Sequence, residues 1–240
     1  MTQKLQKVLA QLGIGSRREM ERWIETGRVN VNHVTAKLGD RVDDHALIEV
    51  DGKPITTGLR AAPSSQTVLL YHKPIGELCT RHDPEGRPTV FDHLPVPPSG
   101  RWIVIGRLDY NTSGLLLFTN DGELANRLMH PSHHLMRTYM VRVYGHVPDE
   151  MLDDLENGVE LEDGMARFEQ VEQVSGDGRN GWYKVEVAMG KNRIVRRLWE
   201  SQDVKVNRLI RVGFGNITLP DDLKPGEYLI LNSEKIKQLE

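Results

Sequence analysis

The chain has 240 residues, of which 38% are hydrophobic and 27% are charged. A chain of this length and composition can bury a sizeable core without disulfides or a structural metal, and it is not expected to be disordered. Its longest apolar runs are far shorter than the roughly 20 residues of a membrane-spanning helix, and its first residues lack the apolar stretch of a signal peptide. The single cysteine, Cys79, excludes an internal disulfide and a thiolate cluster. We therefore expect a cytoplasmic protein with no membrane partner.

The formal net charge of −3 conceals three segments of strong and opposite charge. Residues 1–42 carry a net charge of +4, residues 191–211 carry +5, and residues 147–179 carry −9. Each segment taken alone can be ordinary solvated surface, and this interpretation stays open. Two basic segments far apart in the sequence favour an anionic polymer as partner, with the acidic segment turned away from it.

The N-terminal segment predicts two helices and a strand. Apolar residues spaced as on one helix face predict a helix over residues 3–12. Ser16 followed by Glu19 has the pattern of a capping box and predicts the start of a second helix. Alternation over residues 28–32 predicts a short, half-buried strand.

Three arginines of this segment, Arg17, Arg18 and Arg28, are candidates for binding phosphate. Arg17 and Arg18 directly follow the predicted helix start, where backbone N–H groups and guanidinium groups can face the same anion. The alternative is that these arginines only keep a small domain soluble.

Residues 52–66 predict a linker, because they have no hydrophobic period and collect small residues and proline. We place a first domain at residues 1–60, the linker at 61–66 and a second domain at 67–240.

The second domain alternates strands and helices irregularly. Strand follows strand too often, and the connections are too short, for a regular parallel barrel. We expect an α+β fold with a mixed, mainly antiparallel sheet flanked by helices. The predicted strands are 68–71, 102–105, 115–119, 139–144, 182–187 and 206–212, and the predicted helices are 122–129, 148–157 and 194–199.

The segment 106–122, GRLDYNTSGLLLFTNDG, holds the strongest candidate for a catalytic group. It places Asp109 on a short polar loop between two buried strands, where a carboxylate is held rigidly at the edge of a sheet. Asp109, Asn111 and Ser113 also imitate the start of a calcium loop, but the twelfth position is Asn120 rather than glutamate. A carboxylate that merely caps a turn is the remaining alternative.

A second candidate segment is 190–199, GKNRIVRRLW, in which four cations follow a glycine. The predicted helix places Arg193, Arg196 and Arg197 on roughly one side, as a phosphate cradle or as partners of a buried carboxylate. The segment completes neither a P-loop nor a dinucleotide fingerprint, so no nucleotide cofactor is expected.

No metal site is expected either. His130 and His134 are four residues apart, but Pro131 interrupts the helix that would align them.

The segment 106–122 resembles the signature of the bacterial ribosomal RNA pseudouridine synthases of the small-subunit synthase A group. Residues 1–60 resemble the alpha-L RNA-binding motif that precedes the catalytic domain in that group. Residues 76–90, 124–131 and 209–212 are most similar to members that act on large-subunit rRNA. The resemblance covers essentially the whole chain.

This resemblance implies isomerisation of uridine to pseudouridine in rRNA, with no cofactor, nucleotide or metal. It implies that Asp109 is the catalytic aspartate, that Tyr139 in the sequence Arg137-Thr138-Tyr139 stacks on the target uracil, and that Arg196 pairs with the aspartate. It leaves open whether Asp109 attacks the ribose or the uracil. The expected RNA-binding residues are Arg17, Arg18, Arg28, Arg107, Lys191, Arg193 and Arg197.

Three functions stay open on the sequence alone. The first is uridine isomerisation in large-subunit rRNA, the second is the same reaction on small-subunit rRNA, and the third is a non-catalytic RNA-binding or ribosome-assembly protein with this fold. The expected partner is rRNA or an assembling subunit, and we expect a monomer.

Overall fold

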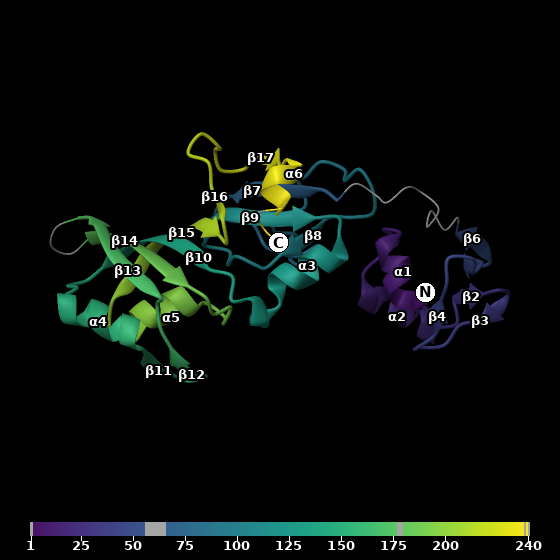
Figure 1. Cartoon of the computed structure of the whole chain (residues 1–240), viewed down its shortest axis with the longest axis horizontal. Coiled ribbons are helices and arrows are strands. Elements are labelled where there is room, and N and C mark those ends of the chain that lie inside the picture. Colours follow the sequence, from purple (N-terminus) through teal and green to yellow (C-terminus); the bar gives the residue numbers. More distant parts are fainter. Residues whose placement is uncertain (1, 56–65, 177–179, 238, 240) are drawn as a thin grey trace. The chain divides into compact units, whose positions relative to one another are not determined.

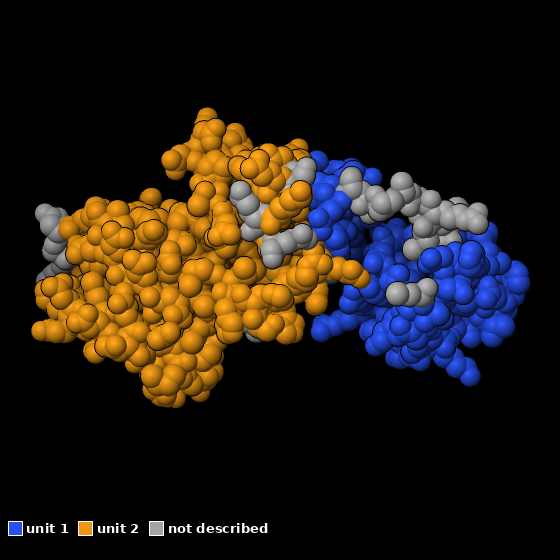
Figure 2. Space-filling view, in the orientation of Figure 1, with its two compact units in different colours: residues 1–67, 95–103, 119–122 blue, residues 68–94, 104–118, 123–240 orange. Residues whose placement is uncertain are grey.

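The computed structural model describes residues 2–55, 66–176, 180–237 and 239 (Figure 1). All but the last residue of the predicted linker 61–66 lies outside these ranges. The described residues pack into two compact units, coloured separately in Figure 2. The first unit lies within residues 1–67, 95–103 and 119–122, and the second within 68–94, 104–118 and 123–240.

Two helices form the first unit's core together with short strands. They are α1 (Leu5–Gln11) and α2 (Arg17–Glu25), and both confirm the sequence-based expectation. The capping box is present, because the Glu19 amide donates to Ser16 Oγ at 3.1 Å and the Ser16 amide donates to Glu19 Oε2 at 3.2 Å. The apolar faces of both helices pack on one hydrophobic cluster.

The strands of the first unit form two small antiparallel sheets. β1 (Gln3–Lys4) pairs with β4 (Arg41–Val42). The other sheet has the order β3 (Val34–Thr35), β2 (Val29–Val31), β5 (Ile48–Val50) and β6 (Lys53–Ile55).

The prediction of a linker from residue 52 onward is wrong for β6. Lys53 pairs with Val50, and Ile55 pairs with Ile48, across a two-residue hairpin. Asp51 and Gly52 in this hairpin have φ values of 50° and 73°, the left-handed turn that an Asp-Gly pair favours. The turn signal was present in the sequence, and the absence of a hydrophobic period in so short a strand concealed it.

The second unit is built on the nine-stranded sheet, which confirms the expected α+β architecture. Its strands follow the order β13-β14-β10-β15-β9-β7-β17, with β16 beside β15 and β8 beside β9 (Figure 1). β10 pairs antiparallel with β14 and β15, whereas β15 pairs parallel with β9, so the sheet is mixed. The bounds are β7 (Val68–Lys73), β8 (Ile103–Ile105), β9 (Ser113–Thr119), β10 (Arg137–Tyr144), β13 (Gln170–Ser175), β14 (Asn180–Val187), β15 (Lys205–Phe214), β16 (Ile217–Thr218) and β17 (Tyr228–Ile230).

Helices and a hairpin accompany this sheet. The helices are α3 (Gly122–Met129), α4 (Asp149–Asn157), α5 (Ile194–Glu200) and α6 (Ser233–Lys237), with a short 3-10 turn at Pro131–His133. β11 (Val159–Leu161) and β12 (Gly164–Ala166) form a separate hairpin. None of the helices in the described part of the chain has the length and apolar character needed to cross a membrane.

The parallel contact between β9 and β15 depends on Gly114. Gly114 is the partner of Arg211 in the register and has a φ of 109°. A Cβ atom added there would overlap the backbone of Arg211. Glycine therefore lets β15 approach the start of β9, and this approach places the loop that carries Asp109 beside β15.

Candidate active site

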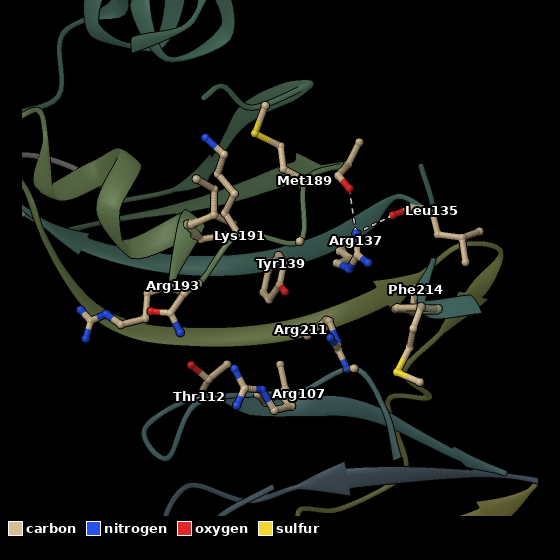
Figure 3. Close-up of a pocket in the computed structure, with 18 of the residues that line it drawn as sticks. Arg107, Thr112, Leu135, Arg137, Tyr139, Met189, Lys191, Arg193, Arg211 and Phe214 are labelled. Atoms are coloured by element: carbon tan, nitrogen blue, oxygen red, sulfur yellow. Dashed lines mark hydrogen bonds between the residues drawn. The ribbon is translucent and has the colours of Figure 1, made fainter. Parts of the chain in front are cut away.

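A pocket of about 1140 Å³ opens in the second unit. Six segments contribute to its lining: residues 104–112, 128–135, the strand β10, residues 167–169, residues 188–195 and the strand β15. In Figure 3, labelled side chains from all of these segments except residues 167–169 lie around the same space. The topology therefore brings together segments that are far apart in the sequence.

Asp109 lines this pocket from a tight turn between β8 and β9. The Thr112 amide donates to the Asp109 carbonyl oxygen at 3.0 Å, which closes the turn. Within the described residues, the Asp109 carboxylate has no hydrogen-bond or ion-pair partner. The carboxylate is therefore free to act on a bound molecule.

Tyr139 lines the same pocket from β10 and is 8% exposed. Its neighbours across the sheet are Val185 on β14 and Arg211 on β15. Asp109 and Tyr139, predicted from separate motifs, thus face one cavity, and a ring in this position can cover a planar base.

Arg196 lies behind the turn and not on the pocket wall. Only 5% of this residue is exposed, its Nη2 donates to the Asn111 carbonyl at 3.0 Å and its Nη1 donates to the Val206 carbonyl at 3.1 Å. Burial lowers the pKa of Arg196, as does nearby Arg193, while the charge of Asp109 raises it. The guanidinium therefore contacts the backbone of the turn that presents Asp109 and acts on the carboxylate through its field.

Lys73, at the end of β7, donates to the backbone of the same turn. This residue was not identified from the sequence. It is fully buried at the end of β7, and its Nζ donates to the Thr112 carbonyl at 2.9 Å and to the Pro74 carbonyl at 2.8 Å. Burial lowers the pKa of Lys73, and the neighbouring acidic groups, including Asp109, raise it. A lysine at the end of a mostly buried strand was the signal in the sequence.

Two further predicted cations stand on the pocket wall. Arg107 is exposed, and Arg193 adopts a left-handed conformation with φ of 47° directly before α5. One amino group of Arg193 binds Glu200 at 3.1 Å, which leaves its other donors available. Both residues are placed where a polyanion entering the pocket would meet them.

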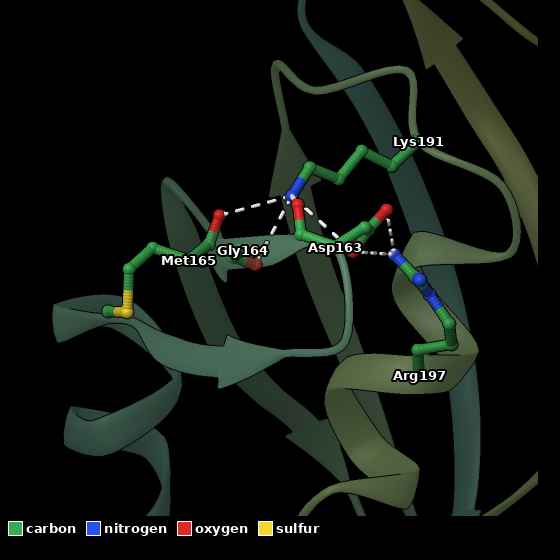
Figure 4. A network of polar contacts seen from close by, with 5 residues as sticks. All are labelled: Asp163, Gly164, Met165, Lys191 and Arg197. Atoms are coloured by element: carbon green, nitrogen blue, oxygen red, sulfur yellow. Dashed lines mark hydrogen bonds and ion pairs between the residues drawn. The ribbon is translucent and has the colours of Figure 1, made fainter.

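Lys191, which also lines the pocket, and Arg197, which does not, both contact the acidic segment (Figure 4). The Lys191 ammonium donates to the carbonyl oxygens of Asp163, Gly164 and Met165 at 2.8, 3.2 and 3.4 Å. Arg197 Nη2 binds both Asp163 carboxylate oxygens at 2.9 and 3.1 Å, and this contact lowers the pKa of Asp163. RNA contact by these two cations stays a prediction.

These contacts correct two expectations about charge. Arg193, Arg196 and Arg197 bind three different partners and do not form one cradle. The acidic segment is not turned away from the site, because Glu169 lines the pocket, paired with Arg167 at 2.9 Å. The negative charge of residues 147–179 partly neutralises the basic segment next to it.

The arginines of the first unit differ in their surroundings. Arg17 and Arg18 are exposed in the first turn of α2. Arg28 donates from Nε to Asp51 at 2.9 Å and stacks over the Trp23 ring at 4.0 Å. Arg17 and Arg18 are therefore the better placed of the three to meet an anion.

The histidines do not form a metal centre in the described residues. His130 and His134 line the pocket, but no group of three or more potential ligands is arranged to hold an ion there or elsewhere in the described ranges.

Comparisons with known proteins identify both units. Residues 67–201 match the model of the RNA pseudouridylate synthase family, and residues 3–48 match that of the S4 domain. A crystal structure of a pseudouridylate synthase covers 99% of both chains with a TM-score of 0.68 and 25% identity.

Close relatives share one name, ribosomal large subunit pseudouridine synthase B. The protein of Pseudomonas aeruginosa is 57% identical over 98% of this chain and 61% of its own length. That of Vibrio vulnificus is 54% identical over 100% of this chain and 75% of its own, and that of Escherichia coli (strain K12) is 56% identical over 97% and 80%. The chain thus spans less than two thirds of the Pseudomonas relative. These names do not support the grouping with the small-subunit synthases.

Both the family match and the identities exceed what a shared fold alone would give. The chain belongs to the RNA pseudouridylate synthase family and carries an S4 domain in its N-terminal part.

Proposed function

We propose that this protein isomerises uridine to pseudouridine in large-subunit rRNA. The observation that carries the proposal is the meeting of Asp109 and Tyr139 in one pocket of a pseudouridylate synthase fold. The name shared by the relatives supports the large subunit as the source of the substrate. Small-subunit rRNA remains the alternative that the same chemistry allows.

The reaction needs no atoms or electrons from outside. The bond from ribose to the uracil nitrogen breaks, the base turns, a bond from ribose to a uracil carbon forms, and the hydrogen on that carbon is lost as a proton while the freed nitrogen gains one. A carboxylate such as Asp109 is suited to form a transient covalent bond or to stabilise a sugar with oxocarbenium character. The base must leave its stack, and stacking on Tyr139 returns about 1–3 kcal/mol of that cost.

Arg196 and Lys73 act in this proposal as positioning residues. Both donate to carbonyl oxygens of the turn that follows Asp109, so they fix its carboxylate relative to the ribose. Both cations also interact electrostatically with Asp109.

The S4 domain is proposed to bind the RNA outside the pocket. The matches to residues 3–48 and 67–201 support domains at 1–60 and 67–240 with the linker between them. Arg17 and Arg18 supply exposed positive charge there. We further propose that the protein acts as a monomer in the cytoplasm, on rRNA or an assembling subunit.

The Asp109→Asn variant tests the catalytic assignment. Pseudouridine formation on rRNA from a strain lacking the protein should fall by several orders of magnitude, because an amide neither attacks nor stabilises the sugar as a carboxylate does. Asp222→Asn, at an exposed carboxylate outside the pocket, is the matched control and should retain activity. Full activity of Asp109→Asn would refute the assignment.

Mapping pseudouridines in both rRNAs of the deletion strain tests the substrate. One or more large-subunit sites should be lost and restored by the wild-type gene. Loss restricted to small-subunit rRNA would favour the alternative substrate. RNA binding without any pseudouridine formation would favour a non-catalytic assembly role.

A further inference from the structure

Four side chains on one wall of the pocket alternate between cation and aromatic ring. In the register of β10 with β15, Arg137 is the partner of Phe214, and Tyr139 is the partner of Arg211. All four line the pocket. A register shift between Thr138 and Tyr139 brings Arg211 and Phe214, three residues apart on β15, beside Tyr139 and Arg137, so the two arginines alternate with the two rings (Figure 3).

The protein holds both guanidinium groups through neutral acceptors. Arg137 Nη1 donates to the carbonyl oxygens of Leu135 at 3.0 Å and Ala188 at 2.8 Å. Arg211 Nε donates to the Leu115 carbonyl at 2.7 Å. Their Cζ atoms lie 5.4 and 5.5 Å from the centre of the Phe214 ring, within cation–π range.

No carboxylate among the described residues pairs with either arginine. Arg211 is only 2% exposed, and its Nη2 is buried without a hydrogen-bond partner. Burial lowers the pKa of Arg137, Tyr139 opposes this shift, and the neighbouring Arg211 adds a smaller lowering effect. Two positive charges that are largely removed from water in one wall destabilise the folded protein unless an anion binds beside them.

Glycines keep the space beside each guanidinium open. A Cβ atom added at Gly190 would lie 3.8 Å from Arg137 Nη2, and one added at Gly106 would lie 4.0 Å from Arg211 Nη1. Both glycines line the pocket. A larger side chain at either position would occupy the approach to the cations.

We propose that Arg137 and Arg211 form a subsite for a phosphodiester group next to the target uridine. The inference rests on the proposed function, since it takes the base to be stacked on Tyr139. Residues two apart on a strand are about 7 Å apart, and direct cross-strand neighbours lie about 5 Å apart. A nucleotide whose base covers Tyr139 therefore has its own backbone within reach of both arginines, and guanidinium groups are suited to phosphate oxygens.

Neutral phosphate analogues test this subsite directly. The substrate is an rRNA fragment with the mapped uridine, made in three forms: native, with a methylphosphonate on the 5′ side of that uridine, or with one on the 3′ side. Single-turnover pseudouridine formation is measured for the wild type, Arg137→Gln and Arg137→Lys. Arg142→Gln, on the same strand but outside the pocket, is the control variant.

On native RNA, Arg137→Gln should lower kcat/KM about 10- to 100-fold, the range of a charge-assisted hydrogen bond. One of the two methylphosphonates should lower wild-type activity by a similar factor and cause no additional loss in Arg137→Gln. Arg137→Lys should recover most of the activity on native RNA, and Arg142→Gln should behave as wild type.

Losses that multiply for both methylphosphonates would overturn the proposal, because a purely structural arginine, or one that faces the uracil, is indifferent to the phosphate charge. Arg211→Lys keeps the charge, so the same methylphosphonate should still lower its activity, as it does in the wild type, and this provides a second measurement. If the wild type formed no pseudouridine on any rRNA, the proposed function itself would be refuted. This outcome is measured separately, with the wild type on native rRNA.

Discussion

At the residue scale, a buried carboxyl group close to the active site governs one pH response. Glu77 is 5% exposed, and Tyr71 Oη donates to its two carboxylate oxygens at 2.9 and 2.8 Å. Burial raises the pKa of Glu77 from its ordinary value of 4.5, and the hydrogen bond from Tyr71 opposes the rise. The folded protein therefore retains a proton on Glu77 at pH values where the unfolded chain has released it.

This difference predicts a pH-dependent stability that Glu77→Gln removes. As pH rises from about 4.5 to the raised folded pKa, the wild type loses stability, because the folded state binds more protons than the unfolded state. The amide of the variant carries no charge and does not titrate. The unfolding free energy of the variant relative to that of the wild type should therefore increase across this pH window and stay constant at higher pH. Urea unfolding at several pH values measures the difference.

Glu85→Gln, an exposed carboxyl on the following loop, is the control for this experiment. The same pH trend in both variants would contradict an origin in the burial of Glu77.

Site residues within recognisable sequence motifs could be predicted, whereas those whose role depends on the pairing of distant strands could not. Asp109 could be found because its motif is long and specific, and Tyr139 because the family resemblance assigned a role to the short sequence Arg137-Thr138-Tyr139. Lys73, Arg137 and Arg211 could not be assigned a place, because their roles depend on pairing between strands far apart in the chain.

At the element scale, the parallel pairing of β9 with β15 depends on one missing side chain. Gly114→Ala adds backbone strain at a φ of 109° and an overlap with Arg211. We expect a loss of roughly 2–5 kcal/mol in the free energy of unfolding, accompanied by loss of activity. Chemical denaturation measures the first and a pseudouridine assay the second.

Gly226→Ala is the matched control, because Gly226 has a φ of 89° and no atom within 4 Å of an added Cβ. It should cost only the strain of about 1–2 kcal/mol. Equal losses in the two variants would show that close approach of the strands is unimportant.

Among the described residues, the β11–β12 hairpin binds only one of two cations, Lys191 and Arg193, for which the sequence predicts the same RNA-binding role. Both residues line the pocket, but Lys191 donates to three carbonyls of this hairpin, whereas Arg193 binds Glu200 and keeps other donors available. Arg193→Gln should therefore flatten the salt dependence of RNA binding by about 0.7 in log–log slope, and Lys191→Met should leave the slope unchanged. Filter binding over a range of salt concentrations measures both, and equal slopes for the two variants would contradict this assignment.

Elements with a clear hydrophobic pattern were predictable, as the continuous apolar run of β9 and the helical spacing of α3 illustrate. The β11–β12 hairpin, β13 and β17 were missed because they are short or largely exposed and show no alternation of apolar and polar residues. The order of strands in the sheet is set by long-range packing and had no local signal.

At the scale of the whole molecule, the first unit should supply salt-sensitive RNA binding. Arg17→Gln/Arg18→Gln removes two exposed charges from the first turn of α2 and should flatten the salt slope by up to about 1.4. Lys37→Gln/Lys53→Gln removes two exposed charges elsewhere in the unit and is the control. An unchanged slope in the arginine variant would refute this role of α2.

The contacts of the turn that carries Asp109 also determine when the pocket can form during synthesis of the chain. Its neighbourhood is completed by hydrogen bonds to Arg196, 85 residues after Asn111, and to Arg211, 96 residues after Leu115. Contacts this distant in sequence form late and slow the folding of a domain. A nascent chain that has released the turn, but not β15, from the ribosome therefore carries no assembled pocket.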